Sequence, residues 1–155
     1  SEGMTVTPIA REELVYVSTD PERVASPVTA NRLSQASLVM PETTYRAVDS
    51  TRLTLRQMLH ETGRNPQTRI EVEDIETAVE LVGMGFGDTV IPKGAAVQLL
   101  PRLAPQARWV SLRPRQYDMF AVVHRADALL SPAAQLMIEL ATRRMQQIAE
   151  PIKRP

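Results

Sequence analysis

The chain has 155 residues, of which 43% are hydrophobic and 23% are charged. This composition is typical of a folded globular protein and excludes the disordered class, which has low hydrophobicity and high charge. Basic and acidic residues balance at 18 each, so the positive field that favours nucleic-acid backbones is missing, and the absence of cysteine excludes disulfides, thiolate metal sites and cysteine nucleophiles.

The first predicted elements are short. Residues 13–18 are rich in β-branched and aromatic side chains and end at an Asp-Pro turn signal, which predicts a strand. Thr29 has a hydroxyl suited to cap a helix, and we predict a short helix over 29–33. A buried strand over 37–40 ends at a proline.

The middle of the chain contains the clearest periodicities. Apolar residues at near-helical spacing predict a helix over 51–62, with Gly63 where a helix C-terminus favours glycine. Residues 69–74 alternate between apolar and charged side chains, which is the period of a half-buried strand. A helix over 75–82 follows, and Asp74 is placed to cap its start.

Three glycines end that helix and lead into a buried strand over 89–91, which a proline stops. Glycines also occur in phosphate loops, but here no Lys-Ser/Thr pair follows and the glycines come after a helix, so a structural turn is the stronger interpretation. A short helix over 94–100, bounded by Pro101, precedes two brief buried strands at 109–112 and 118–125.

The longest predicted element is a helix from Ser131 to about Glu150. Ser131 supplies a capping hydroxyl and the next residue is a proline, which suits the first helical turn. We expect Leu136, Leu140 and Ile148 on its inner side. Strands that alternate with helices along the whole chain predict an α/β fold with largely parallel pairing.

This order of elements resembles the sensor domain of LysR-type transcription regulators. From Ile70 to Pro92 the chain has that family's strand, helix, glycine turn and strand ending in proline, and the resemblance extends from about residue 8 to 149. The other similar stretches are the crossover strand at 12–17, the next helix and strand at 33–41, and the closing strands and last helix at 109–112, 119–125 and 130–134.

The resemblance implies a periplasmic-binding-protein-like fold of type 2, in which a mixed, mostly parallel sheet with flanking helices forms two lobes. Residues 1–155 would be the C-terminal part of an effector-binding domain, with the second lobe at about 20–120. Residues 8–19 and 121–150 would cross back to the first lobe, which we expect to be incomplete. The family's winged helix-turn-helix does not occur in this sequence, so DNA binding is expected only through a module absent from this chain.

The resemblance also predicts how such a domain works. A small-molecule effector binds in a cleft between the lobes of a cytoplasmic, non-enzymatic regulator that self-associates as a dimer or tetramer. The loop after strand 37–40 and the junction after strand 69–74 face that cleft, since ligand sites in α/β sheets lie beyond the carboxyl ends of strands. The candidate effector-binding residues are Pro41, Glu42, Thr43, Thr44, Glu73, Asp74 and Ile75.

Each of these assignments has a structural alternative. Local capping is the stronger interpretation for Thr43 and Thr44, and an N-cap is the stronger one for Asp74, while Glu73 also suits a solvated strand face. The acids disfavour a carboxylate effector unless Arg46 or a group of the first lobe compensates, because like charges repel in a partly desolvated cleft.

We predict no metal and no cofactor. The two histidines, His60 and His124, are far apart and have no metal-ligand spacing, and no stretch is long and apolar enough to span a membrane. Two other functions stay open, a solute-binding module without a DNA role and a small α/β hydrolase. A winged helix upstream would favour the regulator, a secretion signal the solute-binding module, and a contact between a serine and a histidine the hydrolase.

Overall fold

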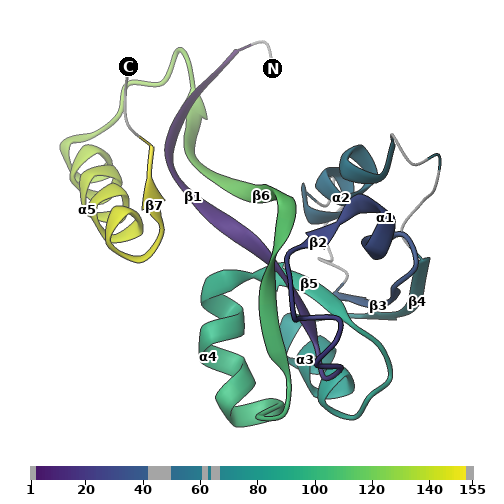
Figure 1. Cartoon of the computed structure of the whole chain (residues 1–155). Coiled ribbons are helices and arrows are strands. Elements are labelled where there is room, and N and C mark those ends of the chain that lie inside the picture. Colours follow the sequence, from purple (N-terminus) through teal and green to yellow (C-terminus); the bar gives the residue numbers. More distant parts are fainter. Residues whose placement is uncertain (1–2, 42–49, 61–62, 64–66, 153–155) are drawn as a thin grey trace. The chain divides into compact units, whose positions relative to one another are not determined.

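The computed structural model describes residues 3–41, 50–60, 63 and 67–152. The chain divides into two compact units, which we call the central unit (residues 13–116) and the terminal unit (residues 1–12 and 117–155). In chain order the elements are β1 (Met4–Ser18), β2 (Val28–Thr29), α1 (Ala30–Leu33), β3 (Ser37–Pro41), α2 (Ser50–His60), β4 (Gln67–Val72), α3 (Ile75–Gly83), β5 (Thr89–Pro92), α4 (Lys93–Leu103), β6 (Arg108–Arg125), α5 (Pro132–Ile148) and β7 (Glu150–Pro151) (Figure 1).

The strands form a mixed sheet, as predicted. One sheet has the order β2-β6-β1-β5, with β7 also paired to β1, and β3 and β4 form a parallel pair. Asp88, just before β5, joins the two: its N–H donates to the Ser37 carbonyl at 3.0 Å, and its own carbonyl accepts from the Val39 N–H at 2.7 Å. This bridge is parallel, so β4, β3 and β5 run in the same direction, while β1 is antiparallel to β5.

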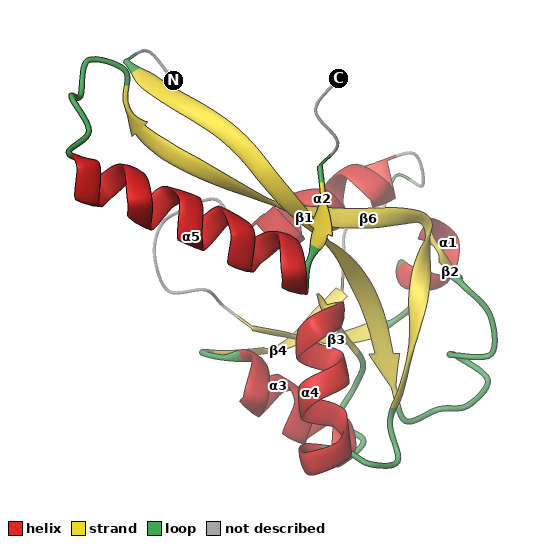
Figure 2. Ribbon diagram, turned by 90° about the vertical axis from the view of Figure 1, so that its left-hand side faces the viewer, coloured by secondary structure: helices red, strands yellow, loops and turns green. Residues whose placement is uncertain are grey.

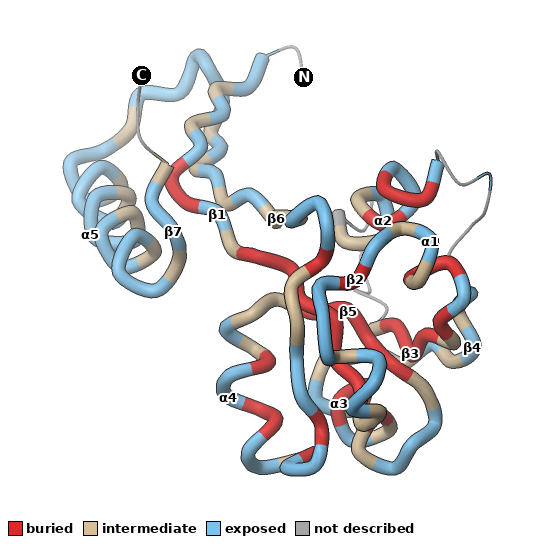
Figure 3. The backbone as a smooth tube through the Cα atoms, viewed as in Figure 1, coloured by how far each residue is buried: buried red, intermediate tan, exposed pale blue. Residues whose placement is uncertain are grey.

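Within the central unit, side chains on both faces of β1 are buried in the core. Leu14 and Tyr16 belong to one core cluster and Val15 and Val17 to another, because successive side chains of a strand point to opposite faces. The first cluster includes residues of α1 and α2, and the second includes residues of α3 and α4. Figure 3 shows the buried stretches concentrated in the strands of this unit. Helices therefore cover both faces of its sheet.

The predicted helix starts are confirmed. Thr29 caps α1 and Asp74 caps α3, where the Asp74 Oδ1 accepts from the Thr77 N–H at 2.7 Å. Ser131 caps α5 and accepts from the Ala134 N–H at 3.2 Å. Among the described residues, no helix combines the length and apolar character needed to cross a membrane.

The predicted end of α4 is wrong, because the helix continues through Pro101 to Leu103. A proline in the last turn removes only one backbone donor, and Leu103 packs against the core cluster. The Ala104 N–H donates to the Leu100 carbonyl at 3.0 Å and closes this turn. The packing of the half-buried Leu103 side chain therefore compensates for the missing donor.

The two strands predicted at 109–112 and 118–125 are one strand, β6, which passes through Pro114. Residues 118–125 are also not buried: exposed and half-buried positions alternate, and Met119 and Val123 are 58% and 55% exposed. In the terminal unit, α5 lies along the ribbon formed by β1 and β6 (Figure 2). A helix covers one face of such a ribbon, so every second side chain stays open to solvent.

The predicted inner side of α5 is also wrong. Leu136, Leu140 and Ile148 are at least 50% exposed, and α5 has no buried residue. Its half-buried positions are Ala134, Ile138, Thr142 and Met145, which recur every three or four residues and form one helical stripe. The helix thus has two apolar stripes, and packing within the terminal unit selects the one that the sequence pattern did not single out.

Candidate functional site

The carboxyl ends of three parallel strands meet at one edge of the central unit. Pro41 at the end of β3 pairs with Val72 at the end of β4, and β5 ends at Pro92. In α/β sheets, ligands bind beyond this edge, where loops and helix N-termini present unpaired backbone groups. We call it the carboxyl edge and take it as the candidate effector site.

The structure brings part of the predicted set together there. Pro41 is half-buried, and Glu73, Asp74 and Ile75 follow directly after its strand partner Val72. Glu42, Thr43 and Thr44 lie outside the described residues. Arg46, proposed to compensate the acids, also lies outside them.

Asp74 acts as a helix cap. Its Oδ1 accepts from the Thr77 N–H at 2.7 Å and its Oδ2 from the Thr77 hydroxyl at 3.0 Å. These hydrogen bonds hold the pKa of Asp74 below its usual value, because they favour the charged carboxylate. The capping interpretation is confirmed, and both carboxylate oxygens already have partners inside α3.

The two neighbours of Asp74 differ. Glu73 is exposed, while Ile75 is half-buried and packs against the second core cluster. The Ile75 side chain therefore contributes to the core. What this junction offers to a ligand is the Glu73 carboxylate and the backbone N–H of Ile75, since the Asp74 carboxylate accepts from the N–H groups of Glu76 and Thr77.

The sequence did not reveal a cluster of charged side chains around Glu13. Glu13 is buried, accepts from the Ser111 hydroxyl at 2.6 Å, and lies 3.8 Å from the Lys93 Nζ and 3.6 Å from the Arg115 Nε. Leu14, the next residue, pairs with Pro92, so the cluster lies at the end of β5. Lys93 also packs over the Trp109 ring, 4.9 Å from its centroid.

A second polar network lies at the opposite edge, at the amino ends of β3 and β5. The buried carboxylate of Asp88 accepts from the Tyr16 hydroxyl and from the Arg23 Nη1, both at 2.5 Å. Burial and the hydrogen bond to Asp88 raise the pKa of Tyr16. The same carboxylate raises the pKa of Arg23 by hydrogen bonding and charge attraction. No local pattern marks this network, because Tyr16 and Asp88 are 72 residues apart.

The glycine turn after α3 forms a structural connection. Gly85 has a φ of +81°, a left-handed conformation that glycine adopts without strain. Gly87 lies so close to β3 that a Cβ there would be 2.5 Å from the Ser37 carbonyl oxygen. Both glycines thus serve the tight path from α3 to β5.

Metal-ligating side chains do not gather in the part of the chain that the structure describes: no three His, Asp or Glu residues come together there in a metal-binding arrangement. The His124 Nδ1 lies 2.9 Å from the Arg125 carbonyl oxygen. A catalytic histidine would need to face a nucleophile instead, so this geometry gives the hydrolase hypothesis no support.

Comparison with known proteins identifies the fold and the family. The LysR substrate binding domain family matches residues 1–146. No curated protein matches the chain by sequence. Among solved structures, the chain is similar to the effector-binding domain of QuiR in complex with shikimate, with a TM-score of 0.72 and 17% identity, over 94% of this chain and 66% of that chain.

Two further structures give the same result. The regulatory domain of MetR from N. meningitidis matches with a TM-score of 0.77 and 16% identity, over 99% of this chain and 70% of that one. Full-length CbnR, solved with its target DNA, matches with a TM-score of 0.69 and 17% identity, over 94% of this chain and 49% of that one. The chain therefore spans 66%, 70% and 49% of these three relatives. It belongs to the family of LysR substrate-binding domains and has their type 2 periplasmic-binding-protein-like fold.

Proposed function

We propose that this chain is the effector-sensing part of a LysR-type transcription regulator and that a small molecule binds at the carboxyl edge of its central unit. The observation that carries the proposal is the meeting of the ends of β3, β4 and β5 at one edge, in a chain of this family. The structure of QuiR with shikimate supports a small-molecule effector. That the effector binds between two lobes is a prediction from the family resemblance.

The chemistry of the edge favours a polar effector with both acceptor and donor groups. The start of α3 offers the Ile75 backbone N–H, which attracts an acceptor, and Glu73 offers a carboxylate. At the end of β5, the Lys93 ammonium lies 3.8 Å from the Glu13 carboxylate, and its side chain is 44% exposed, so it remains open to a ligand. An anionic group of the effector would be stabilised beside Lys93 and repelled beside Glu73.

Regulation needs the effector to bind two arrangements of the protein with different affinity, since equal affinity shifts no equilibrium. In our proposal the effector favours one arrangement of the domain and thereby changes the geometry of attached DNA-binding modules. CbnR, which was solved with its target DNA, supports a DNA role for a longer protein that contains such a domain. The proposed regulator acts in the cytoplasm and is not an enzyme.

We also infer that the terminal unit takes part in self-association as a dimer or tetramer. Its exposed large apolar residues lie on β1, on β6, in the following turn and on α5, and they are Met4, Val6, Met119, Val123, Leu129, Leu136, Met137, Leu140 and Ile148. These are nine of the fourteen exposed large apolar residues in the described part of the chain, and large exposed apolar surface often marks a protein contact. The net charge of zero offers little electrostatic opposition to association.

Thermal unfolding tests the proposed effector site. A ligand that binds only the folded state raises the melting temperature, and shikimate with a panel of other carboxylates, amino acids and sugars is the probe set. Lys93→Gln should reduce the shift produced by an active anionic compound, while Arg102→Gln on the exposed side of α4 should not. A shift that both variants leave intact would place binding away from the carboxyl edge.

A further inference from the structure

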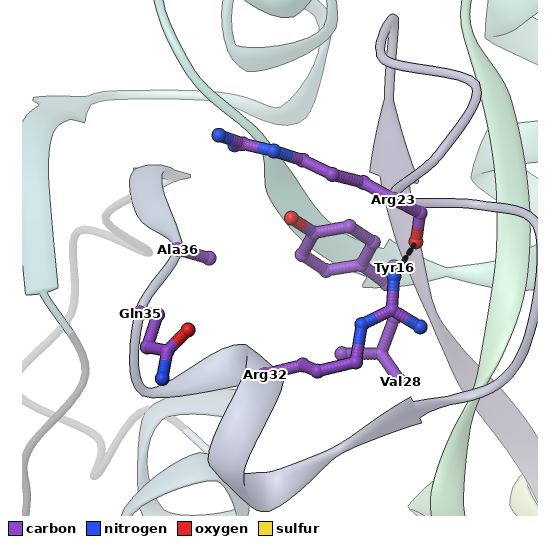
Figure 4. Close-up of a pocket in the computed structure, with 6 residues that line it drawn as sticks. All are labelled: Tyr16, Arg23, Val28, Arg32, Gln35 and Ala36. Atoms are coloured by element: carbon purple, nitrogen blue, oxygen red, sulfur yellow. Dashed lines mark hydrogen bonds between the residues drawn. The ribbon is translucent and has the colours of Figure 1, made fainter.

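A cavity in the central unit lies apart from the proposed effector site. It has a volume of about 190 Å³ and is lined by Tyr16, Arg23, Val28, Arg32, Gln35 and Ala36 (Figure 4). Gln35 and Ala36 directly precede β3, and the Asp88 that Tyr16 and Arg23 contact directly precedes β5. The cavity therefore lies at the amino ends of the strands, at the opposite edge from Pro41, Asp74 and Lys93.

Arg32 is held in place by neutral oxygens only. Its Nη1 donates to the Ser26 hydroxyl at 2.9 Å and to the Ser26 carbonyl at 3.4 Å. Its Nη2 donates to the carbonyls of Glu22 at 3.1 Å and Arg23 at 3.0 Å. Figure 4 shows the bond to Arg23 as a dashed line. These bonds fix the guanidinium at the cavity wall without neutralising its charge.

The two arginines of the cavity differ in their charge balance. Arg23 forms ion pairs with Asp88 and Asp20. Within the described ranges, Arg32 forms no ion pair, and its Nε has no partner. The oxygens that hold Arg32 are neutral, so its full positive charge remains available to an anion. The cavity thus combines a fixed guanidinium, an uncompensated positive charge and space beside it.

The remaining lining residues fit a small oxyanion. In the described part of the chain the Gln35 side-chain amide has no hydrogen-bond partner, so it is free to donate. Val28 and Ala36 are buried and apolar, which lowers the local dielectric and strengthens charge attraction. At about 30 Å³ for each water, a cavity of this size holds about six waters or one compact metabolite.

We propose that this cavity is an anion-binding site, in which Arg32 and Gln35 hold the carboxylate or phosphate group of a small metabolite. Carboxylate and phosphate share the negatively charged oxygens that a guanidinium prefers. Tyr16, which lines the cavity, lies on β1 opposite Val90 of β5, and β5 ends at the proposed effector edge. The site does not depend on the proposed effector, and it would bind anions even if no effector bound at the carboxyl edge.

Titration of the whole 155-residue chain by nuclear magnetic resonance tests the proposal. Sodium phosphate and sodium acetate are added separately at constant ionic strength, with sodium chloride as the control for screening. We expect saturable shifts of the amide signals of Arg32, Gln35 and Ala36 with at least one of the two anions. Saturation by phosphate alone would assign the ligand to the phosphate class, and saturation by acetate would assign it to the carboxylates.

Three variants separate binding from folding. Arg32→Gln should lower the affinity for the anion about tenfold or more, because it removes a charge-assisted hydrogen bond. Gln35→Glu leaves Arg32 in place and puts a negative charge at an exposed position, so it should weaken binding while circular dichroism stays unchanged. Arg102→Gln is the matched loss of charge elsewhere and should have no effect. Absence of saturation with both anions, or equal affinity in Gln35→Glu, would overturn the proposal.

Discussion

The Tyr16 hydroxyl donates a 2.5 Å hydrogen bond to the buried carboxylate of Asp88, a residue 72 positions further along the chain. The bond links β1 to the residue that also joins β3 to β5. Arg23 donates to the same carboxylate oxygen and supplies the compensating charge. A buried carboxylate of this kind is stable only while its partners remain, so the network is expected to be sensitive to the loss of either one.

Tyr16→Phe should lower the free energy of unfolding by about 1–3 kcal/mol, because it removes one partner of a buried acceptor while it keeps the ring in the core. Urea denaturation followed by circular dichroism measures the change. Tyr117→Phe, in the terminal unit, is the matched control and should change the stability little. Equal stability of Tyr16→Phe and the unmodified protein would show that the bond is not important for the fold.

The same network predicts how stability depends on alkaline pH. In the folded protein the pKa of Tyr16 lies above the usual 10.0, so the folded state keeps the phenol proton that the unfolded state loses. Its contribution is complete below about pH 10 and declines as the pH rises toward the folded pKa, by up to about 1.4 kcal/mol for each pH unit. Urea denaturation at pH 9 to 11 should show a steeper loss for the unmodified protein than for Tyr16→Phe. Parallel curves would contradict this assignment.

Gly87→Ala should destabilise the protein by about 1–3 kcal/mol, because the new Cβ would lie 2.5 Å from the Ser37 carbonyl oxygen and push β3 away from Asp88. Gly85 offers the contrast, since space is open there and only its φ of +81° matters. Gly85→Asn should therefore be much milder, because asparagine tolerates left-handed backbone. Thermal melts of both variants measure the two losses of stability. A larger drop in melting temperature for Gly85→Asn than for Gly87→Ala would contradict this prediction.

Local sequence patterns predicted much of the central unit. The alternation of 69–74, the cap at Asp74 and the glycine turn are read over short distances, and the structure confirms β4, α3 and β5 with boundary shifts of at most two residues. The order of these elements carried the family resemblance, which the family match confirms. The predictions were wrong where packing decides between two options, as at Pro101 and on the two apolar stripes of α5.

The candidate site was predictable only in part. Pro41 and Asp74 follow strands, so the rule about carboxyl ends finds them. The cluster around Glu13 and the network of Tyr16 with Asp88 depend on residues far apart in the chain, which only the pairing of β1 with β5 brings together. A single sequence gives no signal for such pairs.

Self-association should depend on the exposed stripe of α5. The double variant Leu136→Gln and Leu140→Gln removes two large apolar side chains that are at least 50% exposed, so it should shift the protein toward the monomer without loss of core packing. Sedimentation velocity over a range of protein concentrations measures this shift. Leu53→Gln, an exposed leucine of α2 in the central unit, is the control and should not change the distribution.

A stripe that is not an interface would behave differently. The unmodified protein and the double variant would then sediment alike at every concentration. That result would contradict the role of α5 in association, and attention would move to Met119 and Val123 on the open face of β6.

The measurement that tests the central claim most directly is an amide chemical-shift map of the whole chain, recorded with shikimate and with each compound that raises its melting temperature. We expect an effector to shift the signals at the starts of α3 and α4, among them Ile75, Glu76 and Lys93. Shifts confined to Arg32, Gln35 and Ala36 would show that small molecules bind the cavity at the other edge. They would contradict an effector site at the carboxyl ends of β3, β4 and β5.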